Sequence, residues 1–129
     1  MSTAATGGTL QIGAVAELTG LSLRTLRHYD EVGLLRPTGR SVGGFRLYTA
    51  PDVERLLLIR RMKPLRFTLE EMADLLEVVD ALAGAPAEAV AGLHARLDDY
   101  VTAAEARRTE LARKLEMADE FISTLRDKL

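Results

Sequence analysis

The order of apolar and polar positions between residues 12 and 48 predicts two short helices followed by a hairpin. Apolar residues recur at helical spacing up to Leu18, and Gly20, a residue type that tolerates positive φ, then breaks the pattern. The hydroxyl of Ser22 is placed to cap the second helix. The positions of this second helix that we expect to face inward are Leu23, Leu26 and, at its end, Val32.

The opposite side of the second helix is polar and basic. We expect five residues to lie mostly on this outer face: Arg24, Thr25, Arg27, His28 and Tyr29. A helix that turns cationic and hydrogen-bonding side chains outward, braced by the helix before it, has the geometry that fits a DNA major groove. The sequence therefore predicts a helix-turn-helix that reads DNA.

Residues 36–48 predict a wing, meaning a hairpin of two short strands beside the helix-turn-helix. The segment follows a helix stop at Gly33, and its proline and glycines suit short strands joined by a turn. Arg40 and Arg46 are expected to reach backbone phosphates or a minor groove. Phe45 and Leu47 are expected to alternate inward, toward the core.

Two further helices are predicted directly after the wing. The third begins at a cap formed by Thr49 and Asp52 and ends or bends at Lys63-Pro64. The fourth begins at a second capping box, Thr68–Glu71, and runs to about Leu82.

The last part of the chain has the pattern of a coiled coil. Residues 83–86 are a short connector, and residues 87–129 contain one glycine and no proline. Apolar side chains recur there in sevens along two seam positions, over about five to six heptads. A stripe this long cannot be buried against the small head alone, so a second chain is its natural partner. The residues that we assign to dimerisation are Val90, Leu97, Val101, Ala104, Leu111, Leu115, Ala118, Ile122 and Leu125.

Charge is distributed unevenly along the 129 residues, although the net charge is only −2. Residues 1–66 contain ten Arg and Lys against five acids, giving +5, and residues 67–129 contain seven against fourteen, giving −7. Phosphate binding requires local positive potential and not a basic protein as a whole. The basic half is the half that carries the predicted helix-turn-helix, which favours DNA over a merely solvated surface.

Several other kinds of chemistry are disfavoured by the composition. The absence of cysteine excludes disulfides and thiolate metal sites in this chain. His28 and His94 lack a third ligand, and the acidic face around Glu70 and Glu71 has no nucleophile beside it, so we expect no metal, no cofactor and no enzyme activity. No apolar stretch reaches the length of a membrane span, and residues 1–9 read as a flexible tail and not as a signal peptide, which favours a cytoplasmic protein.

Five ordered motifs resemble those of the MerR family of bacterial transcriptional regulators. The resemblance covers roughly Leu10 to Leu82, and the long terminal helix agrees with the family's antiparallel dimerisation helix. The motifs are Ile12-Gly13, Thr25-Leu26-Arg27-His28-Tyr29-Asp30, Gly33-Leu34-Leu35, Phe45-Arg46-Leu47-Tyr48 and Phe67-Thr68-Leu69-Glu70-Glu71.

The resemblance implies a mainly α fold, with a winged helix-turn-helix head over residues 10–82 and an antiparallel coiled-coil dimerisation helix over residues 87–129. It also implies a homodimer on double-stranded promoter DNA that bends and untwists an over-long spacer so that RNA polymerase engages both promoter elements. The residues that it places at the DNA are Arg24, Thr25, Arg27, His28 and Tyr29 in the recognition helix and Arg40, Arg46 and Tyr48 in the wing.

Individual roles follow from side-chain chemistry. We weight base readout toward Arg24 and His28, and phosphate contact toward Arg27, Tyr29 and Arg46. Tyr48 fits a half-buried packing role as well as it fits a DNA contact.

Two positions depart from the family pattern. His28 stands where Tyr is common, and Arg66 stands in a loop where Gly is usual, so Arg66 either adopts a strained left-handed conformation or the loop takes another path.

Two alternatives stay open at the level of sequence. The coiled coil could bind a different protein, with the head supplying only weak, non-specific DNA affinity. An effector could be a small organic ligand lodged between head and coiled coil, or there could be none.

Overall fold

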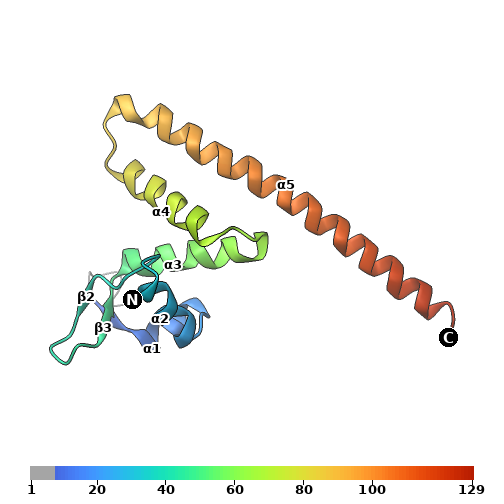
Figure 1. The fold of residues 1–129 in the computed structure, drawn as a ribbon, viewed down its shortest axis with the longest axis horizontal. Coiled ribbons are helices and arrows are strands. Elements are labelled where there is room, and N and C mark those ends of the chain that lie inside the picture. Colours follow the sequence, from blue (N-terminus) through green and yellow to red (C-terminus); the bar gives the residue numbers. More distant parts are fainter. Residues whose placement is uncertain (1–7) are drawn as a thin grey trace. The chain divides into compact units, whose positions relative to one another are not determined.

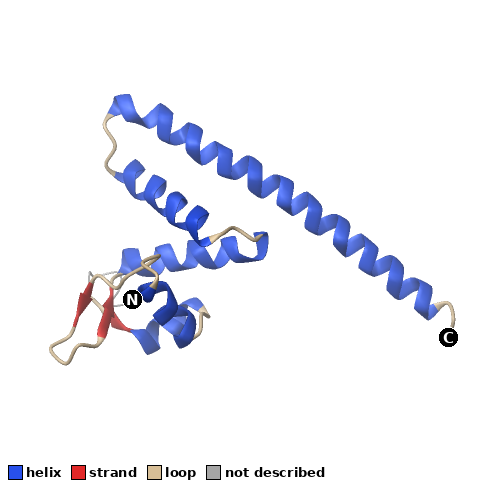
Figure 2. Cartoon of the chain, in the orientation of Figure 1, coloured by secondary structure: helices blue, strands red, loops and turns tan. Residues whose placement is uncertain are grey.

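A computed structural model describes residues 8–129, so most of the predicted N-terminal tail, residues 1–7, lies outside the described part. The chain divides into two compact units, one ending at Leu76 and the other formed by Glu77–Leu129. Figures 1 and 2 show helices joined by short loops, with one small sheet. The elements are β1 (Leu10–Gln11), α1 (Ile12–Thr19), α2 (Leu23–Glu31), β2 (Gly39–Arg40), β3 (Arg46–Tyr48), α3 (Ala50–Met62), the 3-10 helix η2 (Lys63–Leu65), α4 (Leu69–Ala83) and α5 (Ala87–Arg126).

The small sheet contains the predicted hairpin and one strand that the sequence did not indicate. Its order is β1-β3-β2, and both pairs are antiparallel, with Arg40 opposite Arg46 and Leu10 opposite Tyr48. The hairpin β2–β3 is confirmed. The additional strand β1 is only two residues long, too short to show the alternation by which strands are recognised in sequence.

The helix-turn-helix is set by the predicted caps. Gly20 ends α1 and Gly33 follows α2, and both adopt positive φ, at 72° and 78°. The side chain of Ser22 accepts a hydrogen bond from the N–H of Thr25 at 3.0 Å, so Ser22 is the N-cap of α2 as predicted.

Two reciprocal capping boxes start α3 and α4. The hydroxyl of Thr49 accepts from the N–H of Asp52, and the carboxylate of Asp52 accepts from the N–H of Thr49. Thr68 and Glu71 exchange the equivalent bonds at 2.9 and 3.1 Å. Between these helices the chain passes through η2 to Arg66, which has φ 61° and ψ 33°. The left-handed conformation considered for Arg66 is therefore the one adopted.

The core of the first unit lies between α1, α2, α3, the start of α4 and the sheet. Its centre is made of aliphatic and aromatic side chains that are at least nine-tenths buried. These residues are Val15, Leu21, Leu26, Tyr29, Leu35, Tyr48, Leu56, Ile59, Met62, Phe67, Met72, Leu75 and Leu76.

Three predictions of inward-facing residues are wrong. Leu23 is 40% exposed, Val32 is 48% exposed and Phe45 is 64% exposed. Leu23 begins the first turn of α2 and Val32 follows its last residue, so both lie beyond the buried stripe that Leu26 and Tyr29 form. Phe45 precedes β3 and lies in the turn of the hairpin, where strand alternation has not yet begun.

In the second unit, α5 is one continuous 40-residue helix, as predicted (Figure 1). No residue of this helix, all of which is described, is buried. Large apolar side chains are exposed along its C-terminal half, among them Leu111, Leu115 and Ile122. An amphipathic helix is normally stabilised by covering its apolar stripe, and a single chain leaves this stripe open.

A membrane span requires a helix that is both long and strongly apolar. None of the helices within residues 8–129 combines these two properties.

Candidate nucleic-acid interface

The exposed face of α2 carries three basic or polar side chains together. Arg24, Arg27 and His28 are all exposed, and their spacing of three and four residues places them on one side of the helix. Thr25 beside them is half-buried, and its hydroxyl accepts a hydrogen bond from the hydroxyl of Ser22 at 2.9 Å. The structure therefore gathers Arg24, Arg27 and His28 into one surface, as the sequence predicted.

The predicted outward orientation of Tyr29 is wrong. Its side chain is only 3% exposed and lies in the core, three residues after Leu26 on the same face of α2. Its ring remains near the surface group of His28, with centroids 6.3 Å apart and planes inclined by 44°. The spacing of three residues from Leu26 was the signal for a buried position, and the hydroxyl of Tyr29 made a surface position equally acceptable.

An ion-pair cluster connects α2 to the wing. Asp30 Oδ2 accepts hydrogen bonds from Arg46 Nε at 2.7 Å and from Arg40 Nη2 at 3.0 Å. Burial acts to raise the pKa of Asp30, but the hydrogen bonds from both arginines outweigh it and leave that pKa below its usual value. The two wing arginines that were expected to reach phosphates are thus held side by side on one carboxylate.

The pairing of Asp30 with the wing is a feature that the sequence did not predict. A signal was present, because Asp30 and Glu31 are the only acids between residues 18 and 51, a segment that contains five arginines. The pairing itself depends on the fold, because β2 and β3 must fold back beside α2 to bring the arginines to Asp30. Asp30 and Arg46 are 16 residues apart in the sequence.

Tyr48 at the end of β3 is a core residue. It is 1% exposed, and its hydroxyl has no hydrogen-bond partner among the described residues. Burial raises the pKa of Tyr48 above its ordinary value. These observations favour the packing role over the DNA contact, the two alternatives that the sequence left open.

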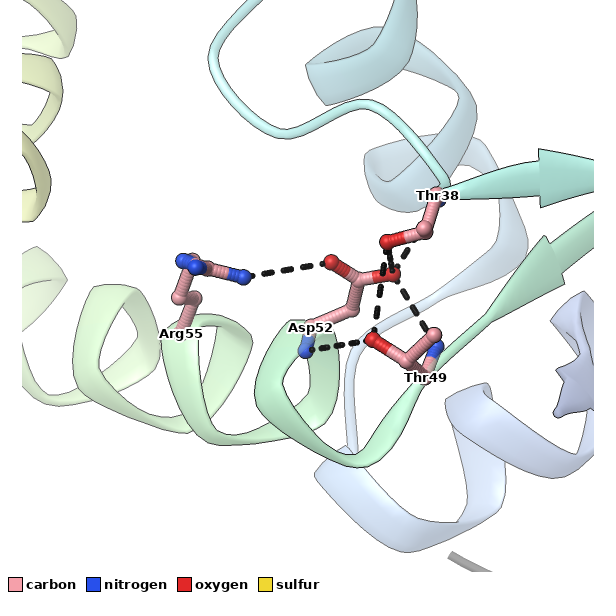
Figure 3. Close-up of polar contacts among 4 residues, drawn as sticks. All are labelled: Thr38, Thr49, Asp52 and Arg55. Carbon is pink, nitrogen blue, oxygen red and sulfur yellow. Dashed lines mark hydrogen bonds and ion pairs between the residues drawn. The ribbon is translucent and has the colours of Figure 1, made fainter. Parts of the chain in front are cut away.

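A buried carboxylate fixes the base of the wing to the start of α3 (Figure 3). Asp52 is 3% exposed, and its Oδ2 accepts from the N–H of Thr38 at 3.1 Å, the hydroxyl of Thr38 at 2.6 Å and the N–H of Thr49 at 3.0 Å. Its Oδ1 accepts from Arg55 at 3.3 Å. Thr38 directly precedes β2 and Thr49 directly follows β3, so one side chain joins both ends of the hairpin.

One arginine of the basic half, Arg60, stabilises the fold by a hydrogen bond between two helices. Arg60 Nη1 on α3 donates to the carbonyl oxygen of Thr19 at 2.6 Å, at the C-terminal end of α1. A cation at that end of a helix complements the unpaired carbonyls and the helix dipole. Not every arginine in the first 66 residues is therefore available to a ligand.

A hollow of about 450 Å³ lies beside the outer face of α2. Arg24, His28 and Lys63 contribute basic groups to it, and no acid is among the residues that line it. The described residues that line it are Arg24, Thr25, His28, Tyr29, Lys63, Phe67, Leu69 and Met72. Basic side chains thus line this hollow from η2 as well as from α2, and cations beside an exposed helix face suit the phosphates that flank a DNA groove.

The family follows from a direct comparison of the sequence. Residues 10–78, more than half of the chain, match the MerR HTH family of regulatory proteins. The chain belongs to the MerR family. The matched range begins at β1 and continues into α4, so it contains the α2 face, the wing and the Asp30 and Asp52 clusters.

Individual MerR-type proteins are similar over most of the chain. An HTH-type transcriptional regulator of Pseudomonas aeruginosa, described as uncharacterized, is 37% identical over 122 residues, which cover 93% of this chain and 80% of that protein. MtaN, the N-terminus of the Bacillus subtilis multidrug transporter activator, has a known crystal structure and is 32% identical in sequence to this chain. The two structures superpose with a TM-score of 0.59, and the match covers 93% of this chain and 97% of MtaN.

A second solved structure contains DNA. HiNmlR, a MerR family regulator lacking the sensor domain, was crystallised bound to promoter DNA. It is 25% identical to this chain with a TM-score of 0.67, and the match covers 89% of this chain and 88% of HiNmlR.

Within residues 8–129 no group of three His, Asp or Glu side chains is arranged to hold a metal ion, and the sequence contains no cysteine. The groups that define the site are the basic side chains of α2, the wing and η2.

Proposed function

We propose that this MerR-family regulator binds a two-fold symmetric promoter site as a homodimer and reads its sequence through α2. The observation that carries the proposal is the shared exposed face of Arg24, Arg27 and His28, next to a wing whose arginines are held in place by Asp30. A helix face of this kind fits a major groove, and neighbouring cations fit the flanking phosphates.

Roles are divided by position on this surface. Arg24 lies in the first turn of α2, the part of a recognition helix that contacts base edges, so we assign base readout to Arg24 and His28. We assign phosphate contact to Arg27, Arg40 and Arg46. Tyr29 and Tyr48 are buried, and we propose that they position α2 and β3 and do not themselves grip DNA.

The homodimer is proposed from α5. Its exposed stripe includes Val101, Leu111, Leu115, Ile122 and Leu125, each between 40% and 64% exposed in a single chain. A second copy of the same helix would cover this stripe in a self-complementary, two-fold arrangement. Two recognition helices related by this symmetry require a DNA site whose halves mirror each other.

We further propose that the dimer acts at bacterial promoters, in the cytoplasm, by bending and untwisting the spacer so that RNA polymerase engages both promoter elements. Support comes from membership of the MerR family and from the promoter DNA bound by HiNmlR.

Selection of bound duplexes from a random DNA pool, followed by footprinting on the selected sequence, tests the proposal. We expect two mirrored half-sites, protected together at the same protein concentration. Protection of a single unpaired half-site at full affinity, or failure to enrich any sequence, would contradict it.

A further inference from the structure

The turn of the wing displays two apolar side chains to solvent. Between Arg40 and Arg46 the chain reads Ser-Val-Gly-Gly-Phe and carries no charge. Val42 is fully exposed, with a relative exposure of 109%, and Phe45 is 64% exposed. Isolated exposed apolar residues are common on protein surfaces, so exposure alone does not indicate a binding site. The conformation of the turn is the additional observation.

The turn is closed by hydrogen bonds around one serine. The N–H of Ser41 donates to the carbonyl of Phe45 at 2.8 Å, and the N–H of Gly44 donates to the carbonyl of Ser41 at 2.9 Å. The hydroxyl of Ser41 also accepts from the N–H of Phe45 at 3.1 Å. Ser41 therefore makes three bonds across the turn, which fixes the backbone on which Val42 and Phe45 stand.

The ring of Phe45 packs on the backbone of its own turn. A Cβ added to Gly43 would lie 3.1 Å from Cε2 and 3.4 Å from Cδ2 of this ring, so a side chain at this position would push the ring away from the turn by a few tenths of an ångström. The contact orients the ring, yet 64% of the residue remains exposed. Phe45 thus has one part of its ring against the turn and the larger part open to a partner.

The positive charge of the wing arginines indicates the chemistry of that partner. Arg40 and Arg46 face each other across the hairpin, one at the end of β2 and one at the start of β3, on either side of the apolar turn. A ligand that meets these residues together must combine negative charge with an apolar edge. The DNA backbone does so, because phosphates alternate with deoxyribose rings along the rim of each groove, and apolar side chains pack on nucleic acid in minor-groove binders.

We propose that Val42 and Phe45 form a non-ionic DNA contact that packs against deoxyribose rings at the rim of the minor groove, beside phosphates bound by the wing arginines. This inference rests on the proposed function and adds two contact residues to it. The contact is sequence-tolerant, because every nucleotide presents the same sugar. It contributes affinity that salt does not screen, unlike the contribution of an arginine.

Titration of the full chain on the duplex selected by the unaltered protein, at several salt concentrations, tests this contact. Phe45→Ala should weaken binding about tenfold at every salt concentration, because apolar area is no longer buried on binding. The slope of log affinity against log salt should stay unchanged, whereas Arg46→Ala should make it shallower by about one unit for each phosphate that is no longer neutralised. Phe45→Tyr keeps the ring and should bind as the unaltered chain does.

Leu18→Ala is the matched control, because Leu18 on α1 is a similarly exposed apolar residue, at 56%, outside the wing. It should leave affinity unchanged, and Val42→Ser should weaken binding in the same salt-independent way as Phe45→Ala. Unaltered affinity of both Phe45→Ala and Val42→Ser, or an altered salt slope, would overturn the contact. Failure of the unaltered chain to prefer any duplex would instead overturn the proposed function, so the two results are distinguishable.

Discussion

Asp30 Oδ2 lies 2.7 Å from Nε of Arg46, and this contact joins the last turn of α2 to the first residue of β3. The same oxygen accepts from Arg40 at 3.0 Å, so the carboxylate also joins both strands of the hairpin. We propose that α2 and the wing contact one DNA duplex together, and fixing their relative positions lowers the entropy that is lost on binding. Asp30 supplies one such restraint, and Asp52 supplies another at the base of the wing.

The first prediction concerns acid stability. The pKa of Asp30 is lower in the folded chain than its ordinary value of 3.8, so its contribution to stability is complete above that value. The contribution is lost as the pH falls through the lower, folded pKa. Asp30→Asn should therefore reduce the free energy of unfolding by about 1–2 kcal/mol at neutral pH, and the difference should shrink below about pH 4.

Denaturant titrations between pH 3 and pH 7 measure this difference. Glu31→Gln is the matched control, because Glu31 is exposed and acts on Arg46 only by longer-range Coulomb attraction, whereas Asp30 accepts a hydrogen bond from Arg46. It should therefore lower the free energy of unfolding less than Asp30→Asn does. A deficit for Asp30→Asn that is constant across the whole pH range would show that the charge of Asp30 is not what stabilises the wing.

The second prediction concerns the backbone at Arg66. This residue has φ 61°, in the left-handed region, which costs a residue with a Cβ about 1–2 kcal/mol. Arg66→Gly should remove that strain, and the added freedom of the unfolded chain offsets part of the gain, leaving a net stabilisation of up to about 1 kcal/mol.

Gly44→Ala makes the reverse change, because it adds a Cβ at a position of positive φ. Gly44 has φ 84°, and a Cβ there would meet no atom within 4 Å, so only backbone strain is introduced. Chemical denaturation should show a lower free energy of unfolding for Gly44→Ala and a higher one for Arg66→Gly. A lower free energy of unfolding for Arg66→Gly than for the unaltered chain would mean that contacts of the arginine side chain stabilise the loop by more than the left-handed backbone conformation costs.

The third prediction concerns the dimer. Leu111 and Leu115 are 40% and 64% exposed in one chain and lie near the middle of the α5 stripe. Burial of each side chain against a second copy would contribute about 1.5–3 kcal/mol. The double variant Leu111→Glu, Leu115→Glu places two charges in the apolar seam and should give monomers or unfolded chain.

Light scattering of the double variant measures its assembly. The matched control, Ala106→Glu with Thr109→Glu, adds the same two charges to other exposed positions of α5, outside the heptad seam, and should remain a dimer. An intact dimer for the seam variant would refute dimerisation through α5.

Local features of this fold were predictable from sequence because their signals are local. Ser22 caps the helix that begins one residue later, and the Thr49–Asp52 box closes over three residues. The length of α5 follows from a heptad pattern that a single glycine does not interrupt. In each case the residues that decide the structure are neighbours along the chain.

What was not predictable depends on contacts between distant residues. Tyr29 is predicted at the surface from its polar hydroxyl, although its spacing of three residues from Leu26 places it on the buried face of α2. Asp30 was overlooked because its partners are 10 and 16 residues away on strands of two and three residues. Phe45 was assigned to the core by strand alternation, which does not extend into a turn.

The most direct test of base reading by α2 is a titration of Arg24→Ala against the selected duplex and a scrambled duplex, both at the same salt concentration. Arg24 is exposed in the first turn of α2, and a bidentate contact between arginine and a base contributes about 1–3 kcal/mol of discrimination. The unaltered chain should prefer the selected duplex, and Arg24→Ala should lose most of that preference while its affinity for the scrambled duplex changes little. An equal loss of affinity for both duplexes would contradict base reading by Arg24 and reduce it to a phosphate contact.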